Sequence, residues 1–161
     1  MEFIEHTSAW AEGEVFQGKI MIATGFFFAA IFVGIYRSED PFLKGSLVPL
    51  GLMMLVLLGY GSFIIYSRPK HAKEIIGLYQ KSSDEAIKQE IAKHINDNKA
   101  GKLLMQVYPI LILVSTIALV FASVPYYKGM ALGFIILFIS TFIIDNGFVS
   151  RSDAFLSFLK Q

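Results

Sequence analysis

Four long runs of apolar residues, separated by polar stretches, dominate the pattern along this chain. Each run is close to the ~20 apolar residues that a helix needs to cross the ~30 Å hydrocarbon core of a bilayer. The pattern predicts an all-α integral membrane protein: one membrane domain over residues 1–161, with four transmembrane helices arranged as two helical hairpins. The expected spans cover residues about 20–36, 47–66, 103–124 and 130–149.

The two hairpins resemble each other in sequence, which indicates tandem copies. A Gly-Lys pair opens each hairpin, a Pro-x-x-Lys-Gly turn joins its spans, and a Ser-Arg pair closes it, at offsets of 83, 84 and 83 residues. These residue types are also common in short loops, so chance is the alternative explanation. Duplicated units of residues 2–81 and 85–161 would be related by an axis along the membrane normal, because each contains an even number of spans. The landmarks are Gly18-Lys19 and Gly101-Lys102, Pro41–Gly45 and Pro125–Gly129, and Ser67-Arg68 and Ser150-Arg151.

The composition supports a membrane protein and excludes several other classes. Hydrophobic residues make up 55% of the chain, and the mean hydropathy is +0.58. A formal charge of +1 provides no basic surface for nucleic acid, so the lipid bilayer is the expected environment. The chain has no cysteine, which excludes disulfides, thiolate metal sites and cysteine nucleophiles.

The distribution of Lys and Arg predicts the orientation, because positive residues are retained on the cytoplasmic side. Eleven of them lie in the two terminal segments and in the central segment of residues 68–102, and three lie in the two turns between paired spans. We therefore expect the N- and C-termini and residues 68–102 to be cytoplasmic, in a bacterial inner (plasma) membrane.

The segment of residues 68–102 is expected to be helical. Apolar residues at helical spacing predict a short amphipathic helix around residues 70–79. Ser82 and Glu85 form a capping-box pattern for a second helix, which either stands alone or extends the third span as a stalk over residues 83–100. Residues 2–17 contain Gly13 and predict a poorer, interfacial helix.

Two spans contain flexible or polar residues at corresponding positions, namely Gly59–Ser62 in the second span and Asp145–Gly147 in the fourth. Such paired interruptions are typical of binding sites in repeat-built transport proteins. Asp145 is the only acidic residue inside any span, and an uncompensated carboxylate there costs at least ~2.5 kcal/mol, which favours a functional role. The alternative is that Asn146-Gly147 is a turn that ends the helix near the interface. The candidate ion- or ligand-binding residues are Asp145, Asn146, Thr141, Tyr60 and Ser62.

The charged central segment offers one weak candidate for a metal site. His94 shares a helix face with Glu90 and Asp97, and His71 lies in the neighbouring predicted helix. The alternative is a solvated charged face, because such spacing is common on exposed helices. No metal site is therefore assigned, and no histidine lies inside a span, which argues against a bis-histidine haem.

We expect the protein not to be an enzyme and to need no cofactor, because no catalytic triad, paired-aspartate motif or glycine-rich phosphate loop occurs in the sequence. The expected function is that of a structural or accessory membrane component, acting through homo-oligomers or a membrane partner protein. The alternative is a small oligomeric channel or transporter subunit with a cation-interacting site near Asp145.

Overall fold

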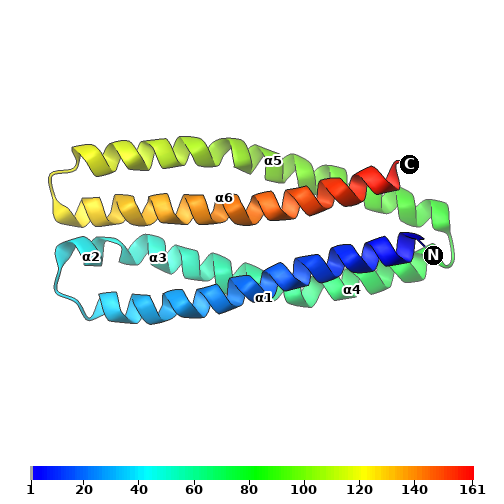
Figure 1. Cartoon of the computed structure of the whole chain (residues 1–161), viewed down its shortest axis with the longest axis horizontal. Coiled ribbons are helices and arrows are strands. Elements are labelled where there is room, and N and C mark those ends of the chain that lie inside the picture. The colour runs from blue at the N-terminus through cyan, green and yellow to red at the C-terminus, as the bar shows by residue number, and fades with distance from the viewer. Residues whose placement is uncertain (1) are drawn as a thin grey trace.

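The computed structural model describes residues 2–161 and consists of helices joined by short turns, with no strand among these residues. Its elements are α1 (Glu2–Tyr36), α2 (Pro41–Gly45), α3 (Leu47–Met54), η1 (Leu55–Tyr60), α4 (Gly61–Tyr79), α5 (Ser83–Phe121) and α6 (Pro125–Leu159). They form four long rods that run along one axis (Figure 1). Because α3, η1 and α4 follow one another without a gap, they form one rod, and α1, α5 and α6 are the other three.

All four rods are long and apolar enough to cross a membrane, and all extend beyond the expected spans. α6 has 35 residues, or about 52 Å at about 1.5 Å per residue, whereas the hydrocarbon core is about 30 Å thick. The prediction of separate helices at residues 2–17 and 70–79 is wrong, because both segments continue the spans next to them. α5 is likewise one helix, so residues 83–100 extend the third span.

The ends of α5 and α6 differ in detail from the sequence prediction. Ser82 is the N-cap of α5 with extended backbone, but its side chain makes no capping hydrogen bond, so the expected capping box does not form. α5 ends at Phe121, and the expected third span of residues 103–124 therefore runs past the helix. α6 begins at Pro125, where the missing N–H of proline costs no helical hydrogen bond.

Neither predicted interruption breaks its helix. Residues before Gly61 form η1, a π-helical turn whose wider winding stays continuous with α3 and α4. Asp145–Gly147 lies within α6, so the alternative of a helix-ending turn at this point is wrong. Single π-helical turns inside longer helices occur frequently at functional sites.

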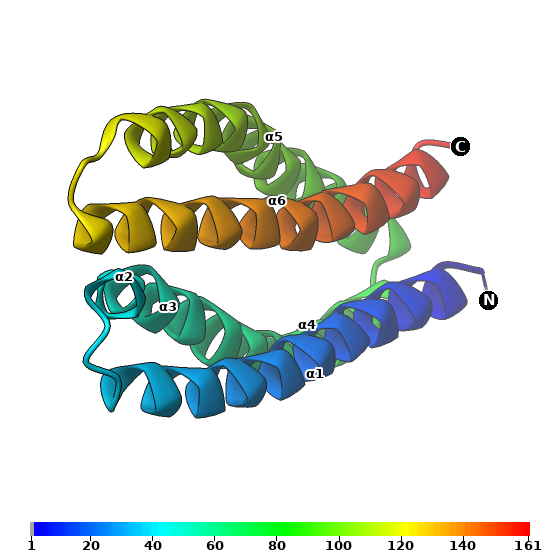
Figure 2. The ribbon, with the colours of Figure 1, turned by 60° about the vertical axis from the view of Figure 1, so that its left-hand side comes forward.

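The four rods pack as two pairs. Both termini and the α4–α5 turn lie at one end, which we call the termini end, and the remaining turns lie at the opposite end, the turn end (Figure 1). α1 packs along α4, and α5 packs along α6. These two pairs lie on opposite sides of the molecule (Figure 2). They meet where α2 and α3 pack on α6, and again where α4 packs on α5.

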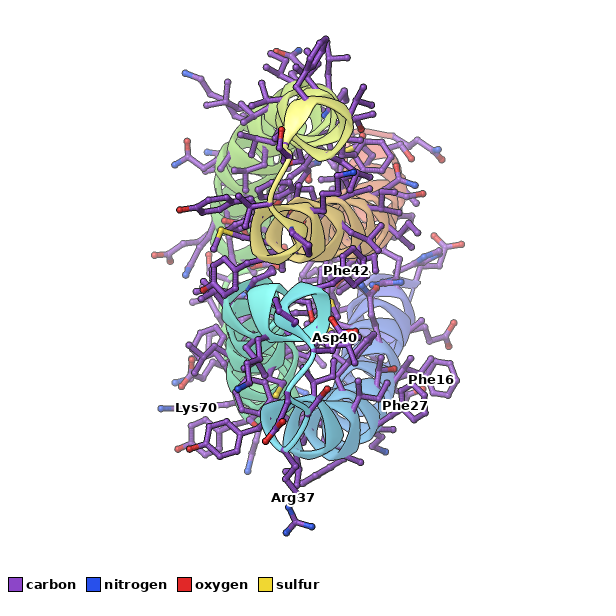
Figure 3. All side chains as sticks on the ribbon, turned by 90° about the vertical axis from the view of Figure 1, so that its left-hand side faces the viewer. Phe16, Phe27, Arg37, Asp40, Phe42 and Lys70 are labelled. Carbon is purple, nitrogen blue, oxygen red and sulfur yellow. The ribbon has the colours of Figure 1, made fainter. Side chains whose placement is uncertain are left out.

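At the turn end, α2 and α6 cross at a backbone distance that only glycine permits. A Cβ atom on Gly45 would overlap the carbonyl oxygen of Tyr126, and one on Gly129 would overlap the carbonyl oxygen of Phe42. Figure 3 looks onto this end and shows Phe42 at the boundary between α2 and α6. The contacts are reciprocal, because Tyr126 and Gly129 each stand 84 positions after Phe42 and Gly45. Small residues allow helices to approach this closely.

Apolar side chains cover much of the outer surface. Phe16 and Phe27 point outward from α1 (Figure 3). The second half of α5 exposes a row of large apolar residues that includes Leu103, Ile110, Leu113, Val114, Ile117, Val120 and Phe121. Monomeric proteins in water rarely expose such large apolar patches, so this surface is suited to contact with lipid or with another protein.

Candidate functional site

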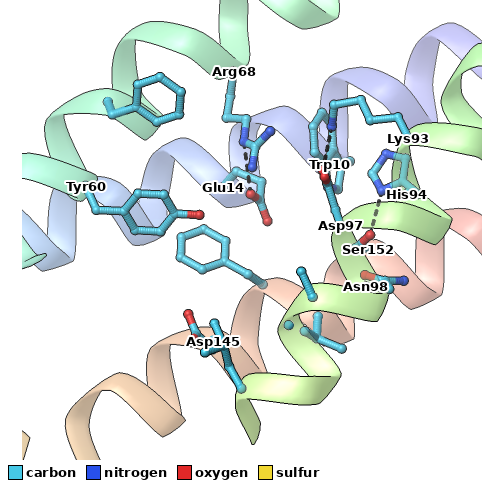
Figure 4. A pocket seen from close by; sticks show the side chains of 16 residues that line it. Trp10, Glu14, Tyr60, Arg68, Lys93, His94, Asp97, Asn98, Asp145 and Ser152 are labelled. Carbon is cyan, nitrogen blue, oxygen red and sulfur yellow. Dashed lines mark hydrogen bonds and ion pairs between the residues drawn. The ribbon is translucent and has the colours of Figure 1, made fainter. Parts of the chain in front are cut away.

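A cavity of about 430 Å³ lies between the four rods in the half of the molecule that contains the termini. α1, α5 and α6 and the junction of η1 with α4 contribute its walls, which combine aromatic rings with charged side chains (Figure 4). Its volume is in the range of small-molecule sites, about 300–1,000 Å³. The aromatic lining residues are Trp10, Tyr60, Phe63 and Phe148, and the charged ones are Glu14, Arg68, Lys93, Asp97 and Asp145.

Glu14 is the most deeply buried carboxylate of this lining, with 2% of its surface exposed. Arg68 Nε lies 3.2 Å from Glu14 Oε2, and Arg151 Nε lies 3.2 Å from Glu14 Oε1. A guanidinium group of Arg151 also donates to Gln17 Oε1. One buried carboxylate is thus shared by two cations from α4 and α6, which offset part of the cost of burying it, and burial still raises the pKa of this carboxyl above its usual value.

Next to the cavity, a chain of buried and partly buried polar side chains joins three rods. His71 Nε2 lies 2.7 Å from Glu90 Oε1, and His94 Nδ1 lies 2.6 Å from Ser152 Oγ. His94 Nε2 lies 3.4 Å from Glu90 Oε2 without forming a hydrogen bond. Glu90 and His94 are both fully buried. This chain connects α4, α5 and α6 at the termini end.

Glu90 remains ionised in this environment. It lies on the part of α5 that precedes the expected third span. Burial tends to raise the pKa of its carboxyl, but the facing imidazoles of His71 and His94 outweigh burial and lower the pKa to about 2. Glu90 is therefore a fixed negative charge at neutral pH that holds the two histidines together.

The weak metal candidates are only partly brought together. Glu90 and His94 are in contact, but Asp97 forms an ion pair with Lys93, with Nζ and Oδ2 3.0 Å apart. Over residues 2–161, no group of three or more Asp, Glu or His side chains is placed to hold a metal ion. The buried network is thus an arrangement of hydrogen bonds and ion pairs.

Asp145 lies on α6 at the edge of the cavity and has a different environment from the other carboxylates. The hydroxyl of Tyr108 donates a hydrogen bond of 2.6 Å to Asp145 Oδ2. Within the described chain, no Lys, Arg or His lies within ion-pair distance of Asp145. Its carboxyl group therefore has a neutral hydrogen-bond partner and no cationic one.

The five residues proposed from sequence divide into two groups. Tyr60 lines the same cavity as Asp145, as expected from their corresponding positions. Thr141 instead donates to the carbonyl oxygens of its own helix, and neither Ser62 nor Asn146 lines the cavity, because both side chains are exposed elsewhere. The structure therefore brings together Asp145 and Tyr60 at the cavity and leaves Thr141, Ser62 and Asn146 outside it. Asp145 takes its hydrogen bond from Tyr108 on α5, a residue that sequence reasoning did not include.

Sequence reasoning also missed Trp10, Glu14 and Arg68, which form the cavity wall opposite Asp145 (Figure 4). Trp10 is buried, and its indole N–H has no hydrogen-bond partner in the described structure. Arg68 and Lys93 lie over its ring at 5.2 and 5.1 Å. A sequence signal did exist, because a glutamate and an arginine flank the first two spans at the same expected membrane boundary.

Comparison with protein families, with curated proteins and with solved structures gives no match for this chain. Its function is therefore inferred from the cavity and from the exposed apolar surface.

Proposed function

We propose that this chain is a non-enzymatic integral membrane protein whose four rods cross the bilayer near the turn end. The length and apolar character of the rods, together with the exposed apolar row on α5, support this proposal. We further infer from the distribution of Lys and Arg that the termini end is cytoplasmic. In this arrangement the cavity lies close to the inner membrane boundary, within reach of the cytoplasm.

The orientation is testable with single cysteines, because the chain has none of its own. Lys44→Cys and Lys128→Cys, at the turn end, should react with a membrane-impermeant thiol reagent added outside intact cells. Ser83→Cys, at the termini end, should react only after the membrane is permeabilised. Labelling of Ser83→Cys in intact cells, with the other two protected, would reverse the proposed orientation.

The reciprocal glycine contacts support the proposal that the two halves are copies. Gly45 meets Tyr126 as Gly129 meets Phe42, and an axis of approximate two-fold symmetry between the halves would produce such a pair of contacts. Gly18 and Gly101 provide a second pair, because Ile65 faces the first and Val149, 84 positions later, faces the second.

We propose that the protein binds a cation at Asp145 and acts as a subunit of a small channel or transporter. The observation that carries this proposal is that one charged residue of the cavity lining has no partner of opposite charge. Arg68 pairs with Glu14 and Lys93 pairs with Asp97, whereas Asp145 has no cationic partner among the described residues. A bound cation would provide the partner of opposite charge that Asp145 lacks.

The test is flux of Na⁺, K⁺ and choline into liposomes that contain the purified protein. Asp145→Asn keeps the shape and the hydrogen bond from Tyr108 but removes the charge, so we expect flux to fall about tenfold or more. Asp153→Asn is the matched control, because Asp153 lies on the same helix but contacts Asn98 and Lys102 and does not line the cavity. Equal flux through both variants would remove Asp145 from the proposed function.

The exposed row on α5 favours assembly as a second candidate function. α5 packs along α6, and the side chains of this row are exposed, so they are available to lipid, to a second copy or to a partner protein. A structural or accessory component would use this surface and would show no cation flux. The oligomeric state in detergent, measured beside the flux assay, separates the two functions.

A further inference from the structure

We propose that the cation bound at Asp145 is an organic ammonium ion, held by the carboxylate and by the faces of Tyr60 and Phe63. This inference rests on the proposed function, since it names the ligand class of the same site. Aromatic faces attract organic cations within about 6 Å of the ring centre, and they do so most strongly where water is excluded.

Three aromatic residues that line the cavity together with Asp145 form a connected cluster. Tyr60 stacks on Phe63 with ring centroids 6.3 Å apart, and it meets Phe148 edge-on at 5.5 Å. All three rings line the cavity together with Asp145. The cavity thus contains both aromatic surface and a carboxylate without a cationic partner.

Some aromatic rings of the cavity already have a cationic side chain over their face, and others do not. Arg151 lies 5.3 Å from the centre of Phe148, and Arg68 and Lys93 lie over Trp10. In the described structure no protein cation lies over Tyr60 or Phe63. Phe63 is 58% exposed and therefore available to a ligand. The free aromatic faces and the free carboxylate thus line the same cavity.

A divalent metal ion fits this site poorly. Divalent cations such as Ca²⁺ take about six to eight oxygen ligands. Asp97 and Glu14 are each committed to cationic partners, and no three Asp, Glu or His side chains of the described chain are grouped to hold a metal ion. An ammonium ion needs only one carboxylate and aromatic contact, which this cavity offers.

Trp10, on the opposite wall, is not available to the same ligand. Arg68 and Lys93 lie over its ring, and its indole N–H is buried. The ligand contacts are therefore those of Asp145 and the free rings, and choline is a suitable probe because it has a quaternary ammonium group.

The experiment is equilibrium dialysis of the full-length protein in detergent against radiolabelled choline, with competition by 3,3-dimethylbutan-1-ol, its neutral isostere, and by Na⁺, K⁺ and Mg²⁺. We expect choline to bind, and the isostere and the inorganic ions to compete poorly. Asp145→Asn should weaken choline binding about tenfold or more, and Phe63→Leu about 2- to 30-fold. Phe63→Tyr, which keeps the ring, and Asp153→Asn should bind as the unchanged protein does.

Any other result of the dialysis experiment would overturn this inference. Competition by the neutral isostere equal to that of choline would show that the charge is not recognised. Failure of choline to bind, with Na⁺ or K⁺ flux that still depends on Asp145, would remove the organic cation and leave the proposed function in place. Absence of choline binding together with flux insensitive to Asp145→Asn would reject both. Circular dichroism of each variant confirms that the helices are intact.

Discussion

Gly129→Ala is expected to destabilise the protein by about 3 kcal/mol or more, the upper end of what overpacking normally costs. The added methyl group would overlap the carbonyl oxygen of Phe42, which belongs to the backbone and cannot turn aside as a side chain can. α2 and α6 must therefore separate. We expect thermal unfolding in detergent, followed by circular dichroism, to shift downward by roughly 6–12 °C for a chain of this size.

Gly77→Ala is the matched control, because a Cβ atom at Gly77 meets nothing within 4 Å. Alanine favours a helix interior over glycine by about 1 kcal/mol, so this variant should be as stable as the unchanged protein or slightly more stable. An unfolding temperature for Gly129→Ala equal to that of Gly77→Ala would show that the helices do not cross as closely as described.

The second large effect is expected for Glu14→Gln, which keeps the shape of the side chain and removes its charge. Arg68 and Arg151 would then face each other with no negative charge between them. Removing one partner of a buried ion pair costs about 3–5 kcal/mol, and here two cations lose the same partner. We expect a lower unfolding temperature and faster proteolysis within α1, measured in detergent by circular dichroism and by limited digestion.

Glu12→Gln provides the comparison, because Glu12 lies on the same helix but is exposed. Its loss should change stability by less than about 0.5 kcal/mol. Adding Arg151→Gln to Glu14→Gln should restore part of the lost stability, since one of the two repelling cations is then removed. Additive losses in the double variant would contradict the shared ion pair.

The helical class and the approximate positions of the four apolar rods were predictable because each depends on a long, continuous pattern. Residues 20–36 contain no charged residue and are almost all apolar, and no other secondary structure suits such a run in a bilayer. The continuity of α1 was not predictable in the same way. Gly13 and the mixture of Glu and Phe around it weaken the helical signal, and packing of Trp10 and Phe155 stabilises this segment in the fold.

The candidate site was only partly predictable because it is assembled from four rods. Asp145 stood out as a lone carboxylate within an apolar run, and Tyr60 as a polar residue at the corresponding position. Trp10 and Glu14 precede the first span by several residues, and nothing local indicates that they face Asp145. Their proximity depends on how α1, α4 and α6 cross, which is a property of helix packing.

The close backbone contact between α2 and α6 at the turn end also provides a point about which α6 could pivot. At Gly45 and Gly129 the backbones of α2 and α6 touch. The two helices cannot come closer there, so a change in their crossing angle would turn α6 about this contact. Asp145 lies about 24 Å along α6 from Gly129, and Leu159 about 45 Å, at about 1.5 Å per residue. A change of about 5° in crossing angle at this contact would therefore displace Asp145 by about 2 Å and the end of α6 by about 4 Å. A change in the crossing angle at the turn end would therefore change the width of the cavity at the opposite end of the molecule.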